Sequence, residues 1–145
     1  DCALGRVMKK QGPIWLGLTN RATSIRPYEG LGEIRRMITR SAYAQLDYSP
    51  LQLAGTVFGM SLLFVAPPVL GLLATGVAQI AGALAWAAMA IAFQPMLRFY
   101  RLSPLWGLAL PAIGILYTAF TFDSAIQFWR GRGGMWKGRA QAIRA

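Results

Sequence analysis

The sequence of 145 residues contains no histidine, a single cysteine and only five acidic residues. Without histidine, this stretch can hold neither a Ser-His-Asp or Cys-His catalytic arrangement nor any histidine-containing metal site. Because Cys2 is the lone cysteine, an internal disulfide is excluded, which fits a reducing, cytoplasmic environment. Five dispersed acids also disfavour a metal site built from carboxylates, so no metal ligand is assigned within this chain.

Charged residues are scarce and unevenly distributed. They make up 14% of the chain and hydrophobic residues 55%, whereas soluble domains carry about 25% charged residues. No Asp, Glu, Lys or Arg occurs between Asp47 and Arg98, or between Arg101 and Asp123. One crossing of a bilayer takes about 20 apolar residues, so the first gap can hold two crossings and the second gap one. The sequence therefore predicts an integral membrane protein, or the membrane part of one.

The net charge of +10 comes from basic clusters that flank the apolar segments. The clusters are Arg35, Arg36 and Arg40, then Arg98 and Arg101, and the tail over residues 130–144. Basic clusters in this position face anionic headgroups and set the topology of the chain. Neither zinc-finger spacing nor an RNA-binding aromatic motif is present. We therefore expect the membrane, and no nucleic acid, as the partner of this charge.

Residues 1–28 are expected to form the end of an α/β domain. A helix runs through residue 11 and stops at Gly12 and Pro13. A short buried strand at residues 14–18 and a loop closed by Pro27 follow.

Residues 29–50 are expected to form an amphipathic helix. At about 100° per residue, polar residues share one face of it and Arg35 lies at the boundary. The polar face comprises Glu33, Arg36, Arg40, Tyr43 and Asp47, and the apolar face Leu31, Ile34, Met37, Ile38, Ala42 and Leu46. Because an apolar segment follows directly, we favour a helix lying in the lipid interface over one packed on a soluble domain.

Residues 51–129 are expected to form a transmembrane region of three hydrophobic helices. The apolar segments comprise residues 51–76, 77–97 and 102–122. Pro67 and Pro68 remove two backbone donors, so the first segment is expected to kink, be interrupted or even re-enter the membrane. Pro111 is expected to kink the third segment.

Residues 130–145 form a basic, glycine-rich tail around Trp136. Such segments let backbone N–H groups and cations converge on a phosphate, although the residues alone favour a simpler role as a headgroup anchor. If all three segments cross from a cytosolic start, the tail lies outside, against the tendency of basic residues to stay inside. If the first segment only re-enters, the tail is cytosolic, and we expect this arrangement.

Five stretches of the chain resemble membrane glycosyltransferases of family 2, in particular the hopene-associated branch. They are DCALGRVMKKQGPIWLGL at residues 1–18, SIRPY at 24–28, RMITRSAY at 36–43, SPLW at 103–106 and WRGRGGMWKGR at 129–139. The resemblance extends over essentially the whole chain, and the last stretch is its most specific part.

The resemblance implies a bacterial inner-membrane enzyme with a cytosolic GT-A catalytic domain, of which residues 1–28 would be the C-terminal remnant. Such enzymes transfer a sugar from a nucleotide-sugar donor to a lipid acceptor, with hopanoids the lipid class associated with this branch. Their Asp-x-Asp motif holds a divalent metal, Mg²⁺ or Mn²⁺. That motif is absent here, so it is expected upstream, and the fragment alone is expected to be inactive.

By the same resemblance, Asp1 matches the general base that deprotonates the acceptor hydroxyl. The alternative is that Asp1 only caps the helix that follows it. Lys137 and Arg139 match the tail motif and would contact the nucleotide diphosphate or an anionic headgroup.

Arg40 matches the arginine of a Gln/Arg-x-x-Arg-Trp motif, although Met37 and Ser41 stand where the motif has Gln/Arg and Trp. Arg36 lies one turn before Arg40, so both could meet a diphosphate leaving group. The alternative is that the two arginines bind lipid headgroups. An alternative for the whole chain is a non-enzymatic polytopic membrane module, such as a transporter subunit or a scaffold.

Overall fold

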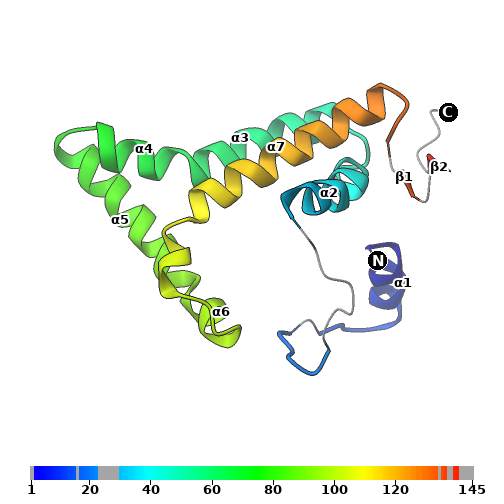
Figure 1. Cartoon of the computed structure of the whole chain (residues 1–145), viewed down its shortest axis with the longest axis horizontal. Coiled ribbons are helices and arrows are strands. Elements are labelled where there is room, and N and C mark those ends of the chain that lie inside the picture. The colour runs from blue at the N-terminus through cyan, green and yellow to red at the C-terminus, as the bar shows by residue number, and fades with distance from the viewer. Residues whose placement is uncertain (1, 16, 23–29, 134, 137–138, 141–145) are drawn as a thin grey trace.

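The computed structural model describes residues 2–15, 17–22, 30–133, 135–136 and 139–140, and almost all of its regular structure is helical (Figure 1). The elements in chain order are α1 (Cys2–Gln11), α2 (Leu31–Gln45), α3 (Pro50–Phe64), α4 (Ala66–Leu73), α5 (Gly76–Ala92), α6 (Gln94–Phe99), the 3₁₀ helix η1 (Pro104–Gly107), α7 (Leu110–Trp129), β1 (Met135–Trp136) and β2 (Arg139–Ala140).

The N-terminal part agrees with the sequence in its helix but not in its strand. Helix α1 ends before Gly12 and Pro13, as expected. The strand expected at residues 14–18 is not formed by its described residues, which have no regular structure. A strand needs a neighbour to complete its hydrogen bonds, and the two described strands, β1 and β2, pair only with each other. The described residues therefore do not display the α/β remnant.

The amphipathic helix is present as α2, but one residue of its assigned polar face is buried. Tyr43 is only 1% exposed, while Leu31 and Met37 of the assigned apolar face are 62% and 39% exposed. The assignment of Tyr43 to the polar face was therefore wrong. Helix α2 packs on α7 through the side that carries Thr39 and Tyr43, while Leu31 at its start stays exposed.

The first apolar segment forms α3 and α4, which are separated by the single residue Val65. Pro67 lies in the first turn of α4, where a backbone N–H has no partner within the helix and its loss costs little. The interruption expected near the two prolines is thus confirmed, and it lies just before them.

The chain then reverses and α5 packs on α4, forming a hairpin that we call the arm (Figure 1). Gly71 and Gly82 make this contact possible, because a Cβ on Gly82 would lie 2.5 Å from the backbone nitrogen of Gly71. By length and composition, two stretches of the described chain are apolar enough to cross a membrane, Pro50–Leu73 and Gly76–Phe99.

The third apolar segment starts with η1 and continues as α7, which extends beyond residue 122 to Trp129. Pro111 lies in the first turn of α7, so the kink expected there was wrong: the proline begins the helix. Because α7 includes Asp123 and Gln127, it does not belong with the two stretches that are apolar enough to cross.

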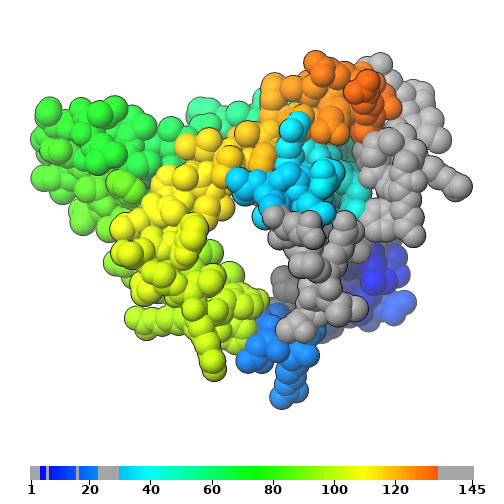
Figure 2. Space-filling view, in the orientation of Figure 1, coloured from blue at the N-terminus to red at the C-terminus, as the bar shows by residue number. Residues whose placement is uncertain are grey.

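Helices α3 and α7 run side by side in opposite directions (Figure 1). Leu53 near the start of α3 shares a core cluster with Ala125 near the end of α7. At the other end, Gly114 of α7 faces the ring of Phe64. In the space-filling view the arm projects away from α2 (Figure 2). The start of α3 and the end of α7 lie beside α2, because Leu53 and Ala125 share their core cluster with Tyr43.

Candidate functional site

Of the five residues assigned a role from the sequence, the structure places two with their side chains. Arg36 and Arg40 lie on α2. Asp1 and Lys137 lie outside the described residues, and Arg139 is described only as backbone of strand β2. The structure therefore brings Arg36 and Arg40 to one helix, and the positions assigned to the base and to the tail cations remain predictions.

Arg36 is directed toward solvent. Its side chain is 75% exposed, and its Nη2 atom lies 3.6 Å from Oε1 of Glu33, one turn earlier. An ion pair of this length with an exposed guanidinium is weak, although the Glu33 side chain is only 24% exposed. The guanidinium can therefore also contact a more highly charged anion such as a phosphate. Arg40 follows one turn later on α2 and is half-buried.

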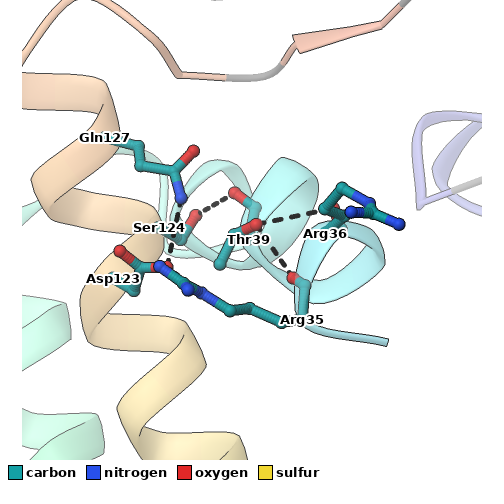
Figure 3. A network of polar contacts seen from close by, with 6 residues as sticks. All are labelled: Arg35, Arg36, Thr39, Asp123, Ser124 and Gln127. Carbon is teal, nitrogen blue, oxygen red and sulfur yellow. Dashed lines mark hydrogen bonds and ion pairs between the residues drawn. The ribbon is translucent and has the colours of Figure 1, made fainter. Parts of the chain in front are cut away.

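An ion pair ties α2 to α7 beside these arginines (Figure 3). Oδ2 of Asp123 accepts a hydrogen bond from Nε of Arg35 at 2.8 Å and forms an ion pair with Nη2 of the same side chain, also at 2.8 Å. The same oxygen accepts a second hydrogen bond from Nε2 of Gln127 at 3.1 Å. The hydrogen bond and the charge of Asp123 raise the pKa of the Arg35 guanidinium, which therefore stays charged.

Two further hydrogen bonds join the helices in the buried part of the contact. Ser124 Oγ donates to the backbone oxygen of Thr39 at 2.6 Å and accepts from the backbone nitrogen of Tyr43 at 3.1 Å. Thr39 and Ser124 are 5% and 3% exposed. We call the contact of α2 with the start of α3 and the end of α7 the joint.

Aromatic rings pack together in the joint where α2 and α7 end. The ring of Tyr43 contacts Tyr48, Phe128 and Trp129 edge to face, with centroids 5.4–5.8 Å apart. Tyr48 stacks on Phe128 at 4.5 Å, and the Tyr43 hydroxyl donates to the Tyr48 carbonyl at 2.7 Å. A cluster of Tyr and Trp at the end of apolar helices is typical of a membrane interface.

An apolar cavity of about 310 Å³ lies between α3 and α7. Its lining consists of Val57, Met60, Val65, Ile115, Ala119 and Phe122, with Ser61 and Thr118 as the polar members. The Thr118 hydroxyl donates to the Gly114 carbonyl of its own helix at 2.8 Å. With almost no free polar group in its wall, the cavity suits a hydrocarbon chain rather than water.

No family model, curated protein or solved structure matches the chain. Within the described ranges, no three side chains of His, Cys, Asp or Glu gather where they could hold a metal ion. The expectation that the metal ligands lie upstream of this chain therefore remains a prediction.

Sequence reasoning missed the residues that build the joint. Asp123 and Ser124 follow the apolar segment that ends at residue 122, and they were given no role. The available signal was their position, because polar groups at the end of an apolar helix need partners. The identity of the partner helix could not be obtained from spacing along the chain.

Proposed function

We propose that the chain is the C-terminal part of a membrane-bound family 2 glycosyltransferase that transfers a sugar from a nucleotide sugar to a lipid. The stretches that resemble the hopene-associated branch and the two apolar helices support this proposal. The whole enzyme would use Mg²⁺ or Mn²⁺ held mostly by residues outside this chain, and hopanoids are the acceptor class that the resemblance favours.

The arrangement around α2 is the observation that carries the proposal. An exposed arginine on a helix fixed beside two antiparallel apolar helices can meet a diphosphate at the bilayer surface. The cavity between α3 and α7 can accept the hydrocarbon part of a lipid whose polar end lies at the level of α2. In this proposal Asp1 takes the proton of the acceptor hydroxyl, and Arg36 and Arg40 stabilise the departing nucleoside diphosphate.

Replacement of Asp1 in the full-length enzyme tests the assignment of the base. Asp1→Asn keeps the shape of the side chain and removes its basic lone pair. Transfer of radiolabelled sugar to the lipid fraction should fall by a factor on the order of 10² to 10⁴, while equilibrium binding of the nucleotide sugar is retained. Transfer at the wild-type rate would show that Asp1 is not the base.

Arginine variants assayed in bilayers and in detergent separate catalysis from lipid binding. If Arg36 and Arg40 stabilise the leaving diphosphate, Arg36→Ala and Arg40→Ala lower the rate at saturating acceptor in both settings. A loss that disappears in detergent or when anionic lipid is varied indicates headgroup binding instead. Arg98→Ala is the matched control, since Arg98 lies in the last turn of α6, a helix that lies away from α2 (Figure 1).

The proposal places the tail on the cytosolic face. Trp129 at the end of α7 contacts Tyr43 of α2, so the tail begins on the same side of the membrane as α2. On the cytosolic side its basic residues also obey the positive-inside tendency. Gly133→Cys in a Cys2→Ser background should resist a membrane-impermeant maleimide in intact cells and react after permeabilisation. Labelling in intact cells would place the tail outside and remove any catalytic role for Lys137 and Arg139.

A further inference from the structure

A single hydroxyl of α7 enters the backbone hydrogen-bond pattern of α2. The Thr39 carbonyl and the Tyr43 N–H lie four residues apart, so a continuous α-helix would pair them with each other. Ser124 Oγ is bonded to both groups, at 2.6 Å to the carbonyl oxygen and 3.1 Å to the nitrogen. We call this pair of hydrogen bonds the Ser124 bridge.

The other hydroxyls of the same helix behave differently. Thr118 donates to the Gly114 carbonyl at 2.8 Å, and Thr121 donates to the Tyr117 carbonyl at 2.9 Å. Both are bonds to the preceding turn of α7 itself, which is the usual choice for a hydroxyl on an apolar helix. Thr121 is as buried as Ser124, at 3% exposure. Burial alone therefore does not explain why Ser124 bonds to α2.

The bridge lies in a row of contacts on one side of α2. Arg35, Thr39 and Tyr43 follow at intervals of four residues and hence share a helix face. Arg35 bonds to Asp123 and Thr39 bonds to Ser124 (Figure 3). The backbone N–H of Tyr43 also bonds to Ser124. Arg36 and Arg40 each follow a member of this row by one residue, and at about 100° per residue both lie next to the edge of the row that Tyr43 forms. The direction of both arginines is thus fixed once the row is docked on α7.

We propose that Ser124 is a positioning residue that sets the rotation and depth of α2 at the bilayer surface and thereby aims Arg36 and Arg40. The Arg35–Asp123 pair supports the same contact from its exposed side, with Arg35 54% and Asp123 23% exposed. Rotation of α2 requires both bonds of the bridge to break inside a buried contact, where the Ser124 hydroxyl would lose its partners, which is costly. The part of the proposal that concerns the arginines rests on the proposed glycosyltransferase function.

The first test measures the bridge itself. In the full-length protein in lipid nanodiscs, ¹⁵N-tyrosine labelling gives backbone amide signals for five tyrosines of this chain, and Tyr43→Phe assigns one of them. Ser124→Ala should move the Tyr43 signal, because its amide loses the serine oxygen. The matched control Thr121→Ala should leave that signal in place. A Tyr43 signal unchanged by Ser124→Ala would refute the bridge.

The second test measures the orientation of α2 without reference to activity. Spin labels at Gln45→Cys and Tyr117→Cys, in a Cys2→Ser background, report the distance between α2 and α7. The distance distribution should be narrow in the otherwise wild-type protein and in Thr121→Ala, and broad or shifted in Ser124→Ala. An unchanged distribution in Ser124→Ala would refute the positioning role.

The third test joins the bridge to catalysis in the full-length enzyme. Because a misplacement of about 1 Å can cost on the order of 10²-fold in rate, Ser124→Ala should lower kcat by roughly 10-fold to 100-fold, with little change in KM for the nucleotide sugar. The double variant Ser124→Ala/Arg36→Ala should lose less than the product of the single losses.

The outcomes distinguish this inference from the proposed function. Independent, multiplicative losses would overturn the link to Arg36 while leaving the glycosyltransferase in place. A wild-type enzyme that transfers no sugar would refute the proposed function, and the Tyr43 signal and the label distances would still decide whether Ser124 positions α2.

Discussion

The joint and the arm differ in how much of their apolar surface is covered by other parts of the chain. In the joint, Tyr43 and Ala125 are 1% and 0% exposed, and four side-chain hydrogen bonds hold α2 on α7 or close its turn to α3. In the arm, Leu73 and Val77 are 78% and 83% exposed, and α4 meets α5 through Gly71 and Gly82. The joint is therefore held by contacts within the chain, whereas the described part of the chain leaves the apolar surface of the arm uncovered, as in surfaces that contact a membrane or another apolar partner.

The largest difference between buried and exposed apolar side chains should come from removing one aromatic ring at each kind of position. Tyr43→Ala deletes the centre of the ring cluster and should lower the free energy of unfolding by about 3–5 kcal/mol. The side chain of Phe58 on α3 is 71% exposed, so Phe58→Ala should change the free energy of unfolding by less than about 0.5 kcal/mol. Thermal denaturation of both variants in the same detergent gives the comparison. Similar losses would contradict the division between packed joint and exposed apolar surface.

A smaller effect is expected from a single methyl group in the arm. In Gly82→Ala the added Cβ would meet the Gly71 nitrogen at 2.5 Å and the Leu70 Cβ at 2.6 Å, so the hairpin must open, at a cost of about 1–3 kcal/mol. Gly59→Ala on α3 meets nothing within 4 Å and should be neutral or slightly stabilising. Melting temperatures in detergent check both. A Gly82→Ala variant as stable as Gly59→Ala would show that α4 and α5 do not pack as described.

The smallest effect isolates one hydroxyl of the joint. Tyr43→Phe removes the hydrogen bond to the Tyr48 carbonyl and should cost about 1 kcal/mol. Tyr117→Phe removes a hydroxyl from a residue that is 44% exposed and should cost almost nothing. Chemical denaturation resolves a difference of this size when both variants are measured beside the wild type. Equal stabilities would mean that the hydroxyl of Tyr43 is already solvated.

The sequence was sufficient to predict the apolar helices, because an uncharged apolar stretch as long as a bilayer is thick is rare in soluble domains. It was less reliable for Pro111, which was interpreted as the site of a kink and instead begins α7. Five elements have a proline in their first turn, at Pro50, Pro67, Pro95, Pro104 and Pro111. Whether a proline breaks a helix or begins one depends on where the preceding helix ends, and a continuous apolar run does not mark that point.

The joint could not be predicted from the sequence, for a different reason. Helical periodicity assigns residues to faces but does not say which face meets another helix. Tyr43 was placed with the arginines because helical spacing puts it on their side of α2, yet its ring is buried because α7 presents Ser124 and Phe128 at that place. The polar residues of α2 and α7 can be assigned a structural role only when both helices are considered together, and they are far apart in the chain.

That separation has a consequence for biogenesis. The partners of the Ser124 bridge lie 81 and 85 residues apart, and contacts between distant residues form late because the intervening chain must first be ordered. During synthesis α2 emerges long before Ser124, and the arm is complete before α7 begins. Until Ser124 is made, the Thr39 carbonyl of α2 must be bonded within its own helix or to water. Closure of the bridge is then a final step of assembly, possible only after the arm has been made and α7 has formed.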